Sequence, residues 1–160
     1  MHFILSNDLY AKNGILEDIH IIVKDDGYKS PLCMIDEGFV SSEYCQKVLK
    51  NLKSEFKDLC IIEVSGKEEP SYDSLRKYLE EAKQFNVDII LGIGGGSWMD
   101  VSKAVGGLLK NHGDPIDFRG FDKVINPGVP VYLIPTTAGT GSEASFNASL
   151  VDKDSNKKLG

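Results

Sequence analysis

The stretch that decides the fold is DIILGIGGGSWMDVSKAV, residues 88–105. Its apolar beginning is typical of a buried strand, expected over residues 87–93, and its second half predicts a helix from residue 98 to residue 110. Glycines let a phosphate approach the backbone closely, and the first amides of a helix attract an anion. The stretch therefore predicts a strand, a phosphate-binding loop and a helix. The candidate residues of this first loop are Gly94, Gly95, Gly96, Ser97 and Asp100.

A second interpretation of the first loop needs no ligand. Ser97 and Asp100 have the S-x-x-D spacing of a helix-capping pair. Capping alone does not require three consecutive glycines, each of which costs conformational entropy on folding. We favour phosphate binding and leave capping open. The spacing differs from the dinucleotide fingerprint G-x-G-x-x-G, since Ser97 replaces its last glycine, and no Walker Gly-Lys-Ser/Thr follows.

A second polar loop follows another expected strand, residues 129–134. It reads IPTTAGTGSE, residues 134–143, and offers four hydroxyls and two glycines. A surface turn needs only one or two such residues, so a ligand-binding role is favoured. Two such loops at one edge of a sheet indicate a dinucleotide site. The candidates here are Thr136, Thr137, Thr140 and Ser142.

Outward from these loops, apolar strands alternate with amphipathic helices. Strands are expected at residues 32–36 and 59–64, and helices begin after Ser41 or Ser42 and after Ser71. This alternation predicts an α/β, Rossmann-like, mainly parallel sheet with helices on both faces and its ligand at the carboxyl edge of the strands. Asp36 ends a strand at that edge. Residues 3–5 and 19–23 are expected to add a strand or hairpin, and residues 146–150 and 158–159 a second one.

Composition excludes several classes of function. The net charge is −6 and the pI about 5.0, with no basic stripe for a nucleic acid. No apolar run approaches the roughly 20 residues of a membrane helix, and the N-terminus lacks the features of a signal peptide. The three cysteines are typical of a cytoplasmic protein, and the three histidines lack metal-ligand spacing. We therefore expect no metal site in this chain.

At this point the motifs are recognisable. GIGGGSWMDVSKAV, followed about forty residues later by PTTAGTGSEA, resembles the iron-containing (group III) alcohol dehydrogenase family, with a similarity running from Gly14 to Gly160. The first motif also occurs in glycerol dehydrogenase and dehydroquinate synthase, whereas the second is more specific to the alcohol dehydrogenase branch.

The resemblance implies that residues 1–160 are one dinucleotide-binding α/β domain, like the N-terminal domain of dehydroquinate synthase. The family's helical domain, with an Asp and three His as metal ligands, is then absent from this chain, and the resemblance implies no catalytic residues within it. Asp36 would bind the adenosine ribose, so NAD is expected rather than NADP. Gly95, Gly96 and Ser97 would bind the pyrophosphate, Asp100 would face the nicotinamide, Thr136, Thr137 and Thr140 would line the adenosine and phosphate side, and Lys158 would lie near the cofactor. Glu69 stands where many members have Asn, so its contact stays open.

The function expected from these features is an NAD(P)-dependent, metal-dependent alcohol dehydrogenase, with this chain as its cofactor-binding half. Its partners would be a small alcohol or aldehyde, Fe²⁺ or another divalent metal in the full-length enzyme, and a second copy in a homodimer. Two alternatives stay open. One is an enzyme like glycerol dehydrogenase or dehydroquinate synthase, and the other is a stand-alone nucleotide-binding module without catalysis.

Overall fold

A four-stranded parallel sheet forms the centre of the computed structural model, which describes residues 7–65, 69–120 and 122–160. The strands are β1 (Pro31–Asp36), β2 (Cys60–Val64), β3 (Ile89–Gly94) and β4 (Val131–Pro135), in the order β2-β1-β3-β4. Gly94 is paired with Pro135 at the last position of the β3–β4 register, so the two polar loops leave the sheet side by side. The strand order thus confirms the predicted parallel sheet.

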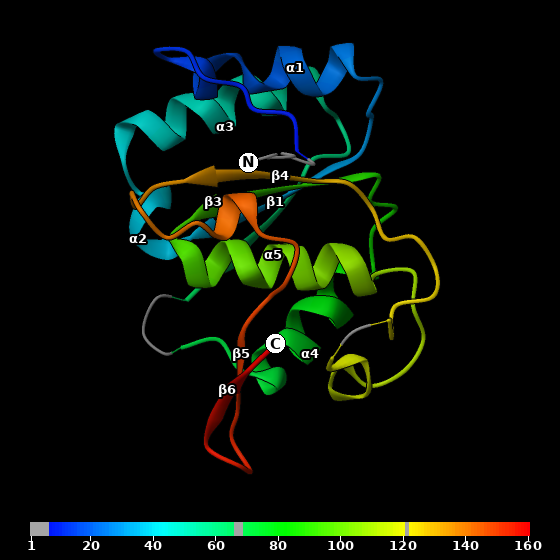
Figure 1. Ribbon diagram of the computed structural model, residues 1–160. Helices are drawn as coiled ribbons and strands as arrows, with labels where there is room; N and C mark the ends of the chain where they lie inside the picture. The colour runs from blue at the N-terminus through cyan, green and yellow to red at the C-terminus, as the bar shows by residue number, and fades with distance from the viewer. Residues whose placement is uncertain (1–6, 66–68, 121) are drawn as a thin grey trace, which may run out of the picture.

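Helices cover both faces of this sheet (Figure 1). Helices α1 (Ile19–Asp25) and α3 (Glu43–Glu55) lie on one face, and α4 (Tyr72–Ala82) and α5 (Gly96–Leu108) on the other. Helix α2 (Glu37–Val40) follows β1 directly. Within the described residues, 3-10 turns occur at Ile15–Asp18, Pro115–Phe118 and Ser142–Ala144. The chain closes with an antiparallel hairpin of β5 (Leu150–Asp152) and β6 (Lys157–Leu159).

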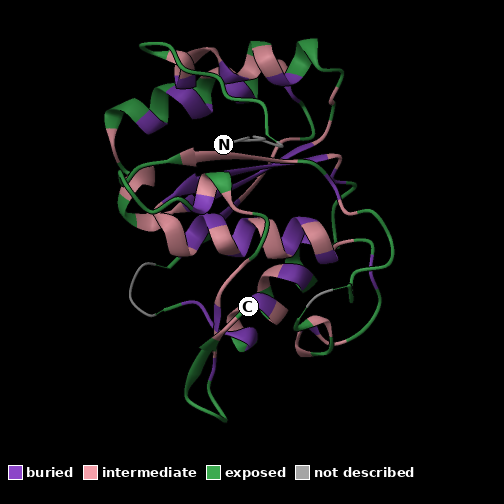
Figure 2. Ribbon diagram, in the orientation of Figure 1, coloured by how far each residue is buried: buried purple, intermediate pink, exposed green. Residues whose placement is uncertain are grey.

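The core consists of two clusters, one on each side of the sheet. Successive residues of β1 alternate between them: Leu32 and Met34 pack under α4 and α5, and Cys33 and Ile35 pack under α1 and α3. All four side chains are fully buried, and in Figure 2 the edge strand β4 is coloured as intermediate in burial. Burial on both faces explains why the two central strands, β1 and β3, are apolar in the sequence, whereas the edge strand β2 includes the exposed Glu63.

The expected element at residues 19–23 is wrong in type, because this segment is helix α1. Ile19 and Val23 lie four residues apart and are its buried residues, the spacing of one helical face. The expected partner segment, residues 3–5, lies outside the described residues. The second expected hairpin is present, but its first strand begins at Leu150, and Phe146 is 88% exposed.

Helix starts follow the predicted caps in two of three cases. Ser42 caps α3 by accepting a hydrogen bond from the Cys45 amide, and Ser71 caps α4 in a reciprocal capping box with Ser74. Helix α5 begins at Gly96, two residues before the expected start. No helix in the described ranges has the length and apolarity needed to cross a bilayer.

Candidate dinucleotide-binding site

The first loop (residues 94–97) and the second loop (residues 136–142) touch at the carboxyl edge of the sheet. The amide of Thr136 donates to the carbonyl oxygen of Gly94 at 2.9 Å. A Cβ atom at Gly95 would lie 3.4 Å from Thr137 Oγ1, and one at Gly96 would lie 2.9 Å from Thr140 Cβ. The contact at Gly96 is too short for a side chain. A glycine at 96 is therefore needed for the two loops to pack in this way.

The start of helix α5 is open at these glycines. Gly95 is the N-cap residue, and its carbonyl accepts hydrogen bonds from the amides of Trp98 and Met99, both at 3.0 Å. No side chain caps this end. The first amides of a helix have no intrahelical acceptor, so those of Gly96 and Ser97 are suited to bind an anion.

The alternative interpretation of Ser97 and Asp100 as a capping pair is therefore wrong. The Asp100 carboxylate points instead to the segment after β4, where it accepts hydrogen bonds from the Ser142 hydroxyl and the Ser149 amide. A capping side chain usually accepts hydrogen bonds from the first amides of its own helix. The Asp100 side chain instead accepts them from residues that lie far away in the sequence. The alternative to phosphate binding at the first loop thus loses its structural basis.

The hydroxyls of the second loop are accessible. Thr136, Thr137 and Thr140 are exposed, whereas Ser142 is buried. The Thr140 hydroxyl donates to Glu143 Oε2 at 3.2 Å and accepts from the Ser142 amide at 3.3 Å. Two glycines, Gly139 at φ 85° and Gly141 at φ 70°, provide the left-handed turns on either side of Thr140.

Asp36 reaches the same edge from β1. Its Oδ1 atom accepts the Gly38 amide at 2.7 Å and so caps α2, and its Cβ lies 3.4 Å from where a Gly94 Cβ would be. The residue is only partly buried. The structure thus brings together three predicted groups of residues from three strand ends: Asp36, the first loop and the second loop.

Lys158, the remaining predicted residue, is not part of these three groups. It belongs to β6, and its Nζ pairs with Glu69 Oε1 at 3.2 Å. The hairpin is held near the start of α4, where the Val151 amide donates to the Pro70 carbonyl oxygen at 2.9 Å. The proximity of Lys158 to a cofactor stays a prediction. Glu69, whose contact with the cofactor the sequence left open, forms this ion pair, and its contact with the cofactor stays open.

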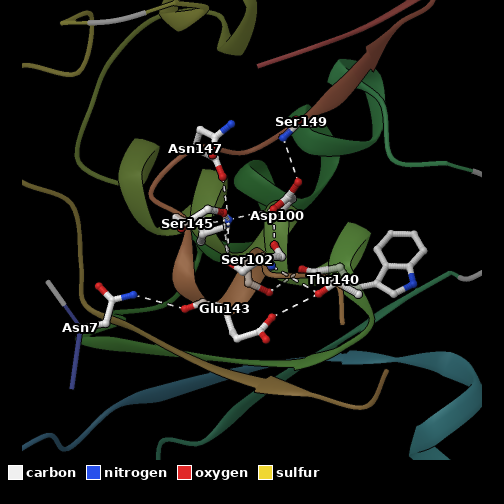
Figure 3. A network of polar contacts seen from close by, with 11 residues as sticks. Asn7, Asp100, Ser102, Thr140, Glu143, Ser145, Asn147 and Ser149 are labelled. Atoms are coloured by element: carbon white, nitrogen blue, oxygen red, sulfur yellow. Dashed lines mark hydrogen bonds and ion pairs between the residues drawn. The ribbon is translucent and has the colours of Figure 1, made fainter. Parts of the chain in front are cut away.

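Lys103 is a residue that the sequence analysis did not single out. It lies one turn after Asp100 on α5, and its Nζ contacts Asp100 and residues 142–147. Figure 3 shows the polar network around Asp100 and these residues. The only sequence signal was the D-x-x-K spacing within the quoted motif. That spacing places both side chains on one helix face but does not identify their partners.

The described part of the chain offers little for metal binding or for catalysis by a cysteine. No group of three or more His, Cys, Asp or Glu side chains there could hold a metal ion. The three cysteines are free thiols, and burial raises the pKa of each, most strongly that of the fully buried Cys33. They therefore stay protonated at neutral pH, as poor nucleophiles.

Comparison with known proteins adds the following findings. The family model described as "Iron-containing alcohol dehydrogenase" matches residues 6–160. Sulfoacetaldehyde reductase from Bilophila wadsworthia is 48% identical over 93 residues, covering 58% of this chain and 24% of that protein. An NAD-dependent methanol dehydrogenase from Bacillus methanolicus is 32% identical over 146 residues, covering 91% of this chain and 38% of that protein.

A crystal structure of an iron-containing alcohol dehydrogenase from Thermotoga maritima superposes with a TM-score of 0.81 at 31% identity. The match covers 99% of this chain and 44% of that one. The chain therefore spans less than half the length of each of these relatives.

Proposed function

The chain belongs to the iron-containing alcohol dehydrogenase family, and from this premise we propose that it is the cofactor-binding part of an NAD-dependent alcohol dehydrogenase. Residues 1–160 would act as one dinucleotide-binding domain. When bound, NAD supplies the hydride acceptor, and the protein orients it against the alcohol. The chain itself contributes the surface that binds NAD.

The observation that carries the proposal is the contact between the two loops at the glycine-rich start of α5. Gly96 has no room for a side chain against Thr140, and the amides of Gly96 and Ser97 lie at a helix start without a side-chain cap. Exposed hydroxyls of Thr137 and Thr140 lie across from these amides. Backbone amides, hydroxyls and a positive helix end together suit a pyrophosphate. This donor set fits a dinucleotide.

The choice of NAD over NADP rests on Asp36. A carboxylate at the end of a parallel strand accepts hydrogen bonds from a ribose 2′-hydroxyl and repels a 2′-phosphate. The proximity of Asp36 to Gly94 supports this role. The printed name of the Bacillus methanolicus relative, an NAD-dependent methanol dehydrogenase, points to the same cofactor.

The proposal assigns the remaining parts of the enzyme to residues outside this chain. The described residues include no cluster of His, Cys, Asp or Glu side chains that could hold a metal ion. The divalent metal, iron by family, would be held by other residues of the full-length protein. The substrate class is a small alcohol or aldehyde, and the enzyme is proposed to be cytoplasmic and homodimeric.

The test is an assay of the full-length protein that carries this sequence. After removal of bound metal with a chelator, it is supplied with NAD or NADP, one divalent metal at a time, and a panel of short alcohols. The reverse reaction uses NADH with aldehydes that include lactaldehyde and sulfoacetaldehyde. We expect turnover with NAD and iron. A protein that binds NAD but turns over no substrate is a binding module, and a protein that binds neither dinucleotide refutes the proposal.

A further inference from the structure

We propose that Asp100 and Lys103 form an internal clamp that fixes the second loop to helix α5, so that they position the dinucleotide site without touching the dinucleotide. The inference rests on the proposed function for the identity of the ligand. It differs from the role that the family resemblance implies for Asp100, which is to face the nicotinamide. The clamped segment is residues 142–149 and begins at Ser142, the last residue of the second loop.

Lys103 binds the clamped segment through its ammonium group. Nζ donates to the carbonyl oxygens of Ser142 at 2.9 Å, Ser145 at 3.2 Å and Asn147 at 2.6 Å. It also lies 3.0 Å from Ser145 Oγ and 2.8 Å from Asp100 Oδ1. An ammonium group has three hydrogens, and five acceptors surround it. Its donor capacity is therefore used within the protein.

Asp100 binds the same segment at both ends. Its Oδ1 accepts from the Ser142 hydroxyl, and its Oδ2 accepts from the Ser149 amide at 3.0 Å. Figure 3 shows Asp100 between Ser145 and Ser149, with its carboxylate turned toward the segment. Both oxygens of the carboxylate thus have protein donors.

Burial strengthens this clamp. The side chains of Lys103 and Asp100 are only 11% and 16% exposed. Surface ion pairs contribute little, but a nearly buried pair with all its hydrogen bonds made is costly to break from one side. Removing either side chain also leaves the charge of the other one nearly buried with fewer hydrogen-bond partners, which lowers stability further.

The clamp matters for the second loop because that loop is pinned at its two ends. At its start the Thr136 amide is bonded to Gly94, and at its end Ser142 is bonded to Asp100 and Lys103. Between them the residues are exposed and include two left-handed glycines. If the second anchor is lost, Thr140 is no longer held against Gly96. The hydroxyls then lose their position relative to the helix amides.

The test compares variants of the full-length protein without ligand and with two ligands. Lys103→Met removes the charge but keeps the length of the side chain. Amide hydrogen exchange in the ligand-free protein should become about tenfold faster across residues 142–149. The dissociation constants for NAD and for ADP-ribose, which lacks the nicotinamide, should rise by the same factor, about tenfold. Lys103→Arg keeps the charge and should restore part of the slow exchange and part of the affinity for both ligands.

Two controls separate the clamp from a general loss of stability. Lys77→Met removes an exposed lysine on α4 and should change neither exchange nor affinity. Val105→Ala opens a cavity in the buried face of α5 and should lower the melting temperature without selectively exposing residues 142–149. If Lys103→Met does not fold, Ser145→Ala, which removes one acceptor of Lys103, should give a smaller effect in the same direction.

Each other outcome has a defined meaning. Unchanged exchange at residues 142–149 in Lys103→Met overturns the clamp. Faster exchange with weaker binding of NAD but not of ADP-ribose overturns the positioning role, because that pattern indicates a contact with the nicotinamide. Wild-type protein that binds neither ligand refutes the proposed function, and the exchange comparison then still decides whether the clamp exists.

Discussion

Gly95→Ala should leave the protein folded and sharply weaken dinucleotide binding. The backbone at Gly95 has φ −75° and ψ 176°, which any residue adopts, and the new Cβ would meet only Thr137 Oγ1 at 3.4 Å. Alanine is a slightly poorer N-cap than glycine but loses less entropy on folding, so the stability change should stay within about 1 kcal/mol. The methyl group would occupy the space through which a phosphate approaches the helix amides.

The size of the binding effect follows from the contacts at risk. A hydrogen bond to a charged group contributes about 1.5–3 kcal/mol. Loss of one amide–phosphate bond should therefore raise the dissociation constant of NAD by about tenfold to a hundredfold. Calorimetric titration of the full-length protein measures this change directly.

The matched control lies in the same helix. A Cβ at Gly107 would have open space around it, so Gly107→Ala should raise stability by roughly 1 kcal/mol and leave the affinity for NAD unchanged. If folded Gly95→Ala protein binds NAD as tightly as wild type, the first loop does not hold the phosphates, and the reasoning fails.

The other predictions concern specificity, packing and pH. Asp36→Asn keeps the cap of α2 but removes the charge, and should narrow the preference for NAD over NADP by roughly tenfold in parallel titrations; an unchanged ratio excludes Asp36 as its cause. Gly128→Ala should destabilise the protein by about 3 kcal/mol in urea unfolding, because its Cβ would lie 2.3 Å from a backbone oxygen of Gly106. Gly106→Ala should cost less, since it meets a Val131 methyl group; the reverse order would contradict this. Arg76 lowers the pKa of Asp114 below its usual 3.8 through a hydrogen bond, so this pair stabilises the fold above that pH and the effect is lost on acidification. The melting-temperature gap between wild type and Arg76→Met should therefore close as the pH falls through the folded pKa, and a constant gap would assign the effect to packing.

The parallel sheet could be predicted because its two central strands are buried on both faces. Leu32–Ile35 is an uninterrupted apolar run, Ile89–Ile93 is interrupted only by Gly92, and each is followed by a capped or glycine-led helix. The helix at residues 19–23 could not be predicted, since a short apolar run fits a strand and a helix equally well. Packing against α3 stabilises this segment as a helix, and that contact cannot be read from the local sequence.

The candidate site could be predicted as far as the chain's local motifs reach. Loops that follow parallel strands must meet at one edge, and Asp36, the first loop and the second loop do so. The partners of Asp100 could not be predicted, because Ser142 and Ser149 lie 42 and 49 residues away in the chain. A capping pair and a long-range clamp use the same residue types at the same spacing. Only the fold distinguishes them.

The most direct test of the central claim is a hydrogen-exchange footprint of NAD on the full-length protein. If the two loops hold the phosphates, saturating NAD should slow amide exchange in peptides covering residues 94–98 and 136–142, with little change at the exposed face of α4. The amides of Gly96 and Ser97 should be among the most protected. Tight binding of NAD with no protection at either loop would contradict the account.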